Sequence, residues 1–148
     1  GSFPREAFVA GSDIIGSRLS LSTAHDVVST VARRGRAGGG GALLLDALGG
    51  RICALAPGDT AFRWRTALAS AQWYVGLPTD AGTTGIASGR RWIADGHRAL
   101  RPVSAGGYVN YLEPGRPVAS YYGRNVGRMR RLRARYDPEG VFDSPWSV

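Results

Sequence analysis

Short apolar segments separated by glycine and proline limit what this chain of 148 residues can fold into. Three of them have the length of strands: "FVAGSDII" at 8–15, "GALLLDAL" at 41–48 and "TALASAQWYVGL" at 66–77. The first indicates a strand or a loop, and the third also suits a helix because alanine and leucine lower β-propensity. No apolar run is long enough to cross a bilayer. We therefore expect one α+β domain, an antiparallel sheet covered by helices.

Two amphipathic helices are indicated before the C-terminal third. Apolar residues recur at helical spacing over 23–34, with Ser22 as the N-cap and Gly35 as the left-handed terminator. Looser helical spacing over 84–100 predicts the second helix, which Gly89 and Gly96 weaken.

A third helix is predicted near the C-terminus. One apolar stripe is formed by Tyr122, Val126, Met129, Leu132 and Tyr136. The pair Asp137-Pro138 should end this helix, because a residue before proline avoids helical geometry. We expect Val141 and Phe142 to fold back onto the core.

Glycine runs and a lone cysteine carry weaker signals. The segments 41–48 and 51–57 around Gly49-Gly50 predict a β-hairpin. The run 38–41 lacks the preceding strand and the Gly-Lys-Ser/Thr ending of a phosphate loop, so we interpret it as a connection. Cys53 is expected to be a small core residue. His25, His97 and Cys53 are scattered, so we predict no metal site.

The net charge of +8 invites a nucleic-acid interpretation, which the composition weakens. All 19 basic residues are arginine, and glycine is abundant, as in proteins of GC-rich genomes. The densest cluster, 124–135, fits the solvated face of the third helix. We expect no nucleic-acid and no membrane partner. The N-terminus shows no signal-peptide pattern, so we expect a cytoplasmic protein.

The C-terminal third resembles a known family. "YVNY" at 108–111 and "ASYYGRNVGRMRRLRARYDPEGVF" at 119–142 are similar to the C-terminal signature of berberine-bridge-type FAD-linked oxidases. That family commonly has Tyr-x-Asn-Tyr, then Tyr-Tyr-Gly-x-Asn, then Tyr-Asp-Pro-x-x-Val-Phe. Met129 stands near the position where leucine is usual.

The resemblance extends upstream through 46–75. Matching positions are Gly49, Gly50, Thr60, Ala61, Phe62 and Arg65. Two positions depart from the family: Arg63 replaces the usual proline and Trp64 the usual histidine. Both lie near the substrate side in the family, so the departures affect the expected substrate.

The resemblance implies part of a substrate domain without its flavin-binding domain. We predict one domain over 3–148, with a partial sheet and helices at 3–105 and the berberine-bridge-type segment at 106–148. Gly1-Ser2 is typical of a tag-cleavage remnant and is left out. A truncated sheet exposes an edge, so we expect a homodimer or a partner chain with a flavin domain. We expect no cofactor in this chain alone, and FAD if such a companion exists.

The candidate catalytic residues are Tyr111 and Gln72, by their position in the family, and Arg65, as a cation that could act on Tyr111. A phenol is a weak base unless a nearby cation lowers its pKa. Arg65 could be that cation if the fold brings it close to Tyr111. Gln72 cannot ionise, so it would orient a carbonyl or hydroxyl. The candidate substrate-binding residues are Arg63, Trp64, Tyr74, Tyr108 and Asn110.

Three functions remain open, and whether the chain is an enzyme is undecided. The first, slightly favoured, is a flavin-free enzyme that promotes a non-redox cyclisation of a polyketide-like small molecule. The second is the substrate-binding half of a split FAD-dependent oxidoreductase. The third is a binding module without catalysis. No side chain here can accept a hydride, so a redox reaction by this chain unaided is disfavoured.

Overall fold

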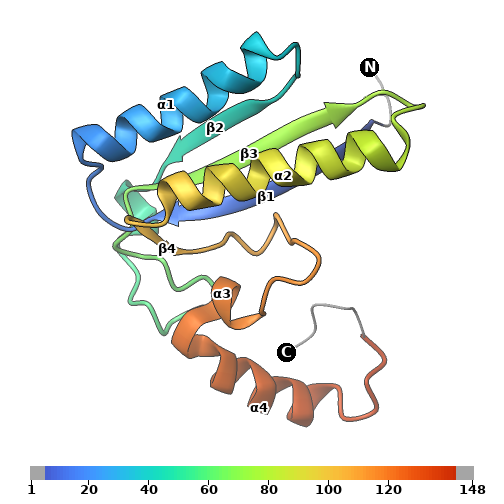
Figure 1. Cartoon of the computed structure of the whole chain (residues 1–148). Coiled ribbons are helices and arrows are strands. Elements are labelled where there is room, and N and C mark those ends of the chain that lie inside the picture. The colour runs from blue at the N-terminus through green and yellow to red at the C-terminus, as the bar shows by residue number, and fades with distance from the viewer. Residues whose placement is uncertain (1–5, 143–148) are drawn as a thin grey trace, which may run out of the picture.

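A four-stranded antiparallel sheet forms the centre of the structure, a computed structural model that describes residues 6–142. Its strands are β1 (Ala7–Ile15), β2 (Ala42–Ala47), β3 (Ala69–Leu77) and β4 (Ser104–Gly106), in the order β2-β3-β1-β4 (Figure 1). This confirms the expected α+β class and makes strands of the segments 8–15, 41–48 and 66–77.

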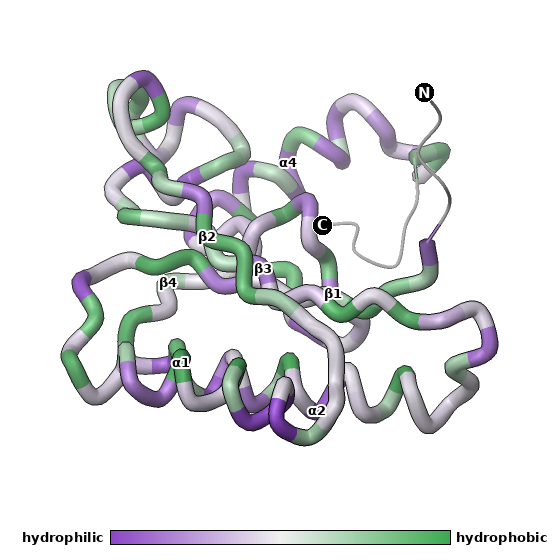
Figure 2. Tube along the Cα trace, turned by 90° about the horizontal axis from the view of Figure 1, so that it is seen from above, coloured by the Kyte–Doolittle hydropathy of each residue, from purple (hydrophilic) through white to green (hydrophobic). Residues whose placement is uncertain are grey.

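Two helices cover one face of the sheet. These are α1 (Leu21–Arg36) and α2 (Gly82–Leu100), and Figure 2 shows both on the same side of the strands. The core between them and the sheet centres on Trp73, which is fully buried and stacks edge-on against Trp92. Val75 and Ile93 complete the contact between β3 and α2. No helix of the described chain combines the length and apolar character that crossing a membrane requires.

Helix α1 is longer than the sequence pattern predicts. It begins after Ser20, whose side chain accepts a hydrogen bond from the backbone N–H of Thr23, so Ser20 and not Ser22 is the N-cap. It also continues through Gly35, and the left-handed residue lies further along, at Gly38 with φ 74°. Helix α2 extends the predicted range 84–100 by two residues at its start.

The predicted hairpin at Gly49-Gly50 is wrong. After β2 the chain forms a short 3₁₀ helix, η1 (Gly50–Ile52), and an exposed loop, while β2 pairs with β3. Strand β3 offers nine residues with one buried face, whereas 51–57 buries none of its residues. Cys53 lies in this loop and is exposed, so its predicted core position is also wrong.

The C-terminal helices lie on the other side of the sheet from α1 and α2 (Figure 2). Short helix α3 (Ala119–Tyr122) and a 3₁₀ turn, η2 (Gly123–Asn125), precede α4 (Val126–Tyr136). Asp137 caps α4, as predicted. Hydrogen bonds from Asn125 and Arg128 to carbonyls of the 57–60 loop hold the start of this helix.

The apolar stripe of α4 is not part of the core. Leu132 and Tyr136 are exposed, and no residue of α4 is buried. Val141 and Phe142 are 73% and 83% exposed, so the prediction that they fold back is wrong. Val126 and Met129 of the stripe are half-buried, so helical spacing predicted the helix but not the exposure of its apolar side.

Helix α2 packs so closely on β3 that a methyl group added at Gly96 should destabilise the fold. A Cβ at Gly96 would overlap ring atoms of Trp73, which is buried and has no room to shift. Gly96→Ala should therefore lower the free energy of unfolding by about 1–3 kcal/mol. Gly35, inside α1, is the matched control, because a Cβ added there would meet no heavy atom within 4 Å. Gly35→Ala should raise the free energy of unfolding by about 0.5–1 kcal/mol, measured by urea denaturation.

Candidate functional site

The sheet face opposite α1 and α2 carries rows of side chains that the helices leave uncovered. Directly paired residues share a face, so Ser12, Gln72 and Leu44 form one row across β1, β3 and β2. Ala10 and Tyr74 begin the next row. Because alternate residues of β3 point into the core, Gln72 and Tyr74 are displayed on this face.

The Tyr-x-Asn-Tyr segment lies over this face. It follows β4, and the backbone N–H of Tyr108 donates to Ser12 Oγ at 2.9 Å. The N–H of Tyr111 donates to the carbonyl of Tyr108 at 2.9 Å, which closes a turn within the motif. Asn110 donates its side-chain amide to the hydroxyl of Tyr108. The motif thus forms a compact turn fastened to β1.

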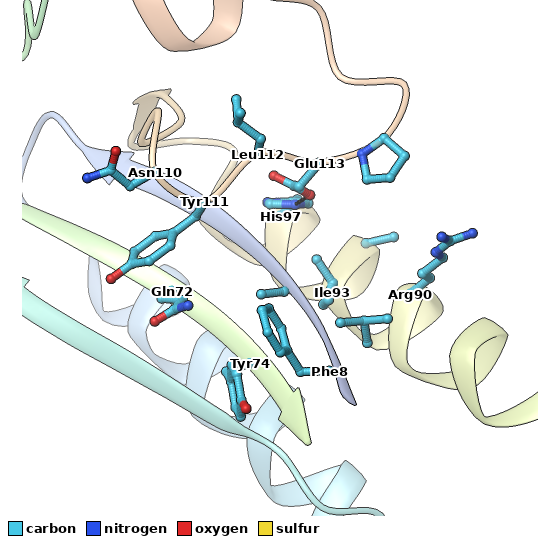
Figure 3. Close-up of a pocket in the computed structure, with 14 residues that line it drawn as sticks. Phe8, Gln72, Tyr74, Arg90, Ile93, His97, Asn110, Tyr111, Leu112 and Glu113 are labelled. Carbon is cyan, nitrogen blue, oxygen red and sulfur yellow. Dashed lines mark hydrogen bonds and ion pairs between the residues drawn. The ribbon is translucent and has the colours of Figure 1, made fainter. Parts of the chain in front are cut away.

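A cavity of about 660 Å³ lies between this turn, the sheet face and α2. Figure 3 shows the ring of Tyr111 on the Gln72 side of this cavity, with His97 and Glu113 at its far wall. Tyr74 lies two residues further along β3. Phe8 stacks on its ring, and its hydroxyl donates a hydrogen bond to Glu6. The cavity therefore brings Gln72, Tyr74, Asn110 and Tyr111 to one place.

A second cavity, of about 730 Å³, lies on the other side of Tyr111. Asn110 and Tyr111 line both cavities. Here the ring of Tyr108 makes edge contacts with Phe62 and Tyr111, at centroid distances of 5.9 and 5.2 Å. The Tyr-x-Asn-Tyr turn is thus an aromatic and amide partition between two hollows.

Arg65 lines the second cavity together with Tyr111, so the fold brings the two residues to one hollow. Its guanidinium donates to the carbonyl of Ile52 at 3.1 Å and to Thr60 Oγ1 at 2.5 Å, and lies over the ring of Phe62. Its buried Nε has no hydrogen-bond partner among the described residues. Arg65 therefore anchors the 52–62 loop. Among residues 6–142, no tyrosine hydroxyl and no carboxylate is a hydrogen-bond or ion-pair partner of its guanidinium.

Arg63 and Trp64 line neither cavity. The indole N–H of Trp64 donates to the carbonyl of Gly107 at 3.1 Å, and its ring packs on Gly106. Arg63 stacks on Trp64 and packs against Gly123. The two departures from the family motif thus contact the C-terminal tail, the segment 106–142, at its start and near Gly123.

The far wall of the first cavity is a histidine held between two carboxylates. His97 Nδ1 lies 2.6 Å from Asp13 Oδ2, and Nε2 lies 2.7 Å from Glu113 Oε2. Asp13 is buried on β1, where Trp73 Nε1 donates to Oδ2 and Ser104 Oγ donates to Oδ1. The imidazole therefore bridges the sheet core and the tail.

Arg116 completes this cluster. Its guanidinium lies 2.6 Å from Glu113 Oε1, donates to the carbonyl of Ser12 and stacks on Tyr121. Tyr121 is buried, and its hydroxyl accepts the backbone N–H of Glu113. Burial raises the pKa of Tyr121, so it stays a neutral phenol near pH 7.

The carboxylates control the charge of His97. Burial alone would lower its pKa, but hydrogen bonds and charge from Asp13 and Glu113 raise the pKa to about 9. Burial would raise the pKa of Glu113, but hydrogen bonds and charge from His97 and Arg116 lower it. The imidazolium form therefore predominates at pH 7.

Sequence reasoning did not identify this cluster. The available signal was His97 itself, four residues after Ile93 on the buried face of a predicted helix. A histidine at such a position needs a polar partner. The partners lie 84 residues before it and 16 residues after it, so no spacing in the sequence points to them.

Comparison with known proteins places this chain in a family. The family model described as "Berberine and berberine like" matches residues 107–148. An uncharacterized FAD-linked oxidoreductase of Bacillus subtilis, YgaK, is 40% identical over 104 residues. The match covers 69% of this chain and 22% of the YgaK sequence. The chitooligosaccharide oxidase of Gibberella zeae is 27% identical over 150 residues, covering 93% of this chain and 30% of its own.

Solved structures share the fold over nearly the whole chain. Physcomitrella patens BBE-like 1 superposes with a TM-score of 0.86 at 23% identity, covering 100% of this chain and 31% of that one. The chain therefore belongs to the berberine-bridge-like family of FAD-linked oxidoreductases and corresponds to part of its substrate domain. It spans 22% of the length of YgaK and of a second B. subtilis relative.

The raised pKa of His97 predicts a pH-dependent stability. Because the folded value of about 9 exceeds the ordinary value of 6.5, the stabilisation is fully present below pH 6.5 and is lost as pH rises through about 9. His97→Gln should lower the free energy of unfolding by about 1–3 kcal/mol at pH 6 and by less at pH 10. Urea denaturation at both values measures this, and an equal loss at the two would contradict it.

Proposed function

We propose that this chain forms the substrate-binding wall of a FAD-linked oxidoreductase site, with Tyr111 and Gln72 facing the reacting part of a small-molecule substrate. One observation carries the proposal: the Tyr-x-Asn-Tyr turn holds Tyr111 over the uncovered sheet face, in one cavity with Gln72. The family supports the chemistry. The flavin would be held by residues outside this 148-residue sequence or by a partner chain.

A carbohydrate is the substrate class that fits this wall best. Sugars offer many hydroxyls and apolar ring faces, which match amide and phenol groups beside aromatic rings. The amides of Gln72 and Asn110 and the rings of Phe62, Tyr108 and Tyr111 supply both. Two relatives are a chitooligosaccharide oxidase and a carbohydrate oxidase by name.

The residues present fit a flavin as one wall of its site. The uncovered row through Gln72 and Leu44, with Tyr111 above it, would contact the ring system. Among residues 6–142 the glycine run 38–41 joins α1 to β2 and does not open a helix, so it is no phosphate cradle. Bound flavin supplies hydride acceptance, which no side chain can provide.

The chain's own residues would bind, orient and hold a proton. The amide N–H of Gln72 donates to a substrate oxygen and fixes its position on the sheet. The oxygen of Tyr111 would hydrogen-bond the hydroxyl at the reacting carbon, where it could accept the hydroxyl proton as that carbon gives up its hydride to a bound flavin. The aromatic partition of Tyr108 and Phe62 excludes water from one side of the substrate.

The non-redox cyclisation of a polyketide-like substrate remains a second proposal because it would use the same cavity. There Tyr111 and Gln72 would polarise a carbonyl while the walls hold a reactive conformer. The two proposals differ in their ligand. Carbohydrate binding favours the first, whereas binding of a flat polyketide without FAD favours the second.

Ligand titration by NMR tests the carbohydrate proposal. Chitotriose should shift amide resonances of Gln72, Asn110 and Tyr111, with a dissociation constant of about 1 mM because only one wall is present. Tyr111→Phe should weaken binding about fivefold by removing one hydrogen bond. Tyr136→Phe, on the exposed side of α4, is the matched control and should leave binding unchanged. Shifts confined to other surfaces would contradict the proposal.

A visible absorption spectrum tests where the flavin is held. We expect the isolated 148-residue chain, incubated with FAD and desalted, to show no flavin band, because its glycine run 38–41 opens no helix that could hold the phosphates. A retained band would overturn the proposal that the flavin is held by residues outside this sequence or by a partner chain.

A further inference from the structure

We propose that the cluster of Asp13, His97, Glu113 and Arg116 is a positioning device that sets the 107–116 loop, and with it Tyr111, against the sheet. The four residues are positioning residues, since they act on a substrate through Tyr111. The inference rests on the proposed function only for the role of Tyr111. The order of the loop itself can be measured without any ligand.

The cluster joins a fixed part of the fold to the loop. Asp13 is buried on β1 and held by Trp73 and Ser104. His97 comes from α2 and reaches Asp13 with one ring nitrogen and Glu113 with the other, at 2.6 and 2.7 Å. A protonated ring donates at both nitrogens, so a single side chain connects sheet, helix and loop.

Polar contacts replace apolar packing where the loop meets the sheet. No residue of 107–116 belongs to the hydrophobic core. The loop is held instead by Ser12, which accepts from Tyr108 and donates its own N–H to Glu113. Arg116 adds a hydrogen bond to the carbonyl of Ser12. Removing charge from this cluster should therefore loosen the loop more than it loosens the core.

Strand β1 has a glycine, Gly11, at the point where Glu113 contacts it. A Cβ at Gly11 would lie 2.5 Å from Glu113 Oε2 and 2.6 Å from a methyl group of Ile93. Glycine at this position thus lets the carboxylate lie directly against β1, beside α2. Because Glu113 follows Tyr111 by two residues, its position limits where the phenol can lie over Gln72.

The cluster is electrically balanced, with two carboxylates facing an imidazolium and a guanidinium. Arg116 also lies 3.9 Å from Asp13, so each cation contacts both anions. Removing one partner from such a cluster leaves the others uncompensated. This makes loop order sensitive to each member, as a positioning device requires.

Amide hydrogen exchange of the 148-residue chain tests the proposal, with His97→Gln and Glu113→Gln as variants. Protection of the Tyr108, Tyr111 and Glu113 amides should fall about tenfold or more beyond any loss in β1 and β3, whose protection follows the change in global stability. The ring resonances of Tyr111 should shift in both variants. His25→Gln, at the exposed second histidine, is the matched control and should change neither measurement.

Glu113→Gln keeps the size of the side chain, so it decides the matter if His97→Gln fails to fold. Unchanged loop protection and unchanged Tyr111 resonances in a folded Glu113→Gln chain would overturn the proposal. So would an equal loss of protection in β1, β3 and the loop, which would mean that the cluster stabilises the whole fold. Neither outcome depends on chitotriose, so the carbohydrate proposal is tested separately.

Discussion

One-sided burial of the sheet is the constraint on which the rest of this structure depends. Trp73 packs between β3 and α2, and Gly96 allows the helix backbone to approach the indole ring. This contact takes the apolar side of β1 and β3 into the core. The alternate residues, among them Ser12 and Gln72, must then lie on the opposite face. The tail meets that face through the hydrogen bond from Tyr108 to Ser12 and through the aromatic rings of its Tyr-x-Asn-Tyr turn.

The tail also makes an ionic contact with β1 and α2, in which His97 lies between Asp13 and Glu113. A buried charge cluster is a weak source of net stability, because desolvation offsets much of the attraction. Its geometry is far more specific than that of an apolar contact, since His97 must satisfy Asp13 and Glu113 together. The cluster also forms one wall of the cavity that holds Tyr111. His97 and Glu113 therefore both hold the loop in place and line the candidate site.

Much of the local structure could be predicted from the sequence. Helical spacing located α1, α2 and α4, and Asp137-Pro138 marked the end of the last helix. The Tyr-x-Asn-Tyr motif indicated the family and drew attention to Tyr111, and the upstream resemblance drew attention to Gln72; the two residues line one cavity. These features depend on neighbours a few residues apart, and periodicity or a contiguous motif records such relations directly.

Long-range contacts decided what the sequence alone did not determine. The pairing of β2 with β3, the exposure of Cys53 and of the α4 stripe, and the role of Arg65 each depend on which surfaces meet. The His97 cluster is the clearest case, because its contact between Asp13 and His97 joins residues 84 positions apart. The sequence by itself determined the three long helices and the family. Only the tertiary structure determined which polar groups would be buried together, since burial and charge compensation are properties of the assembled fold.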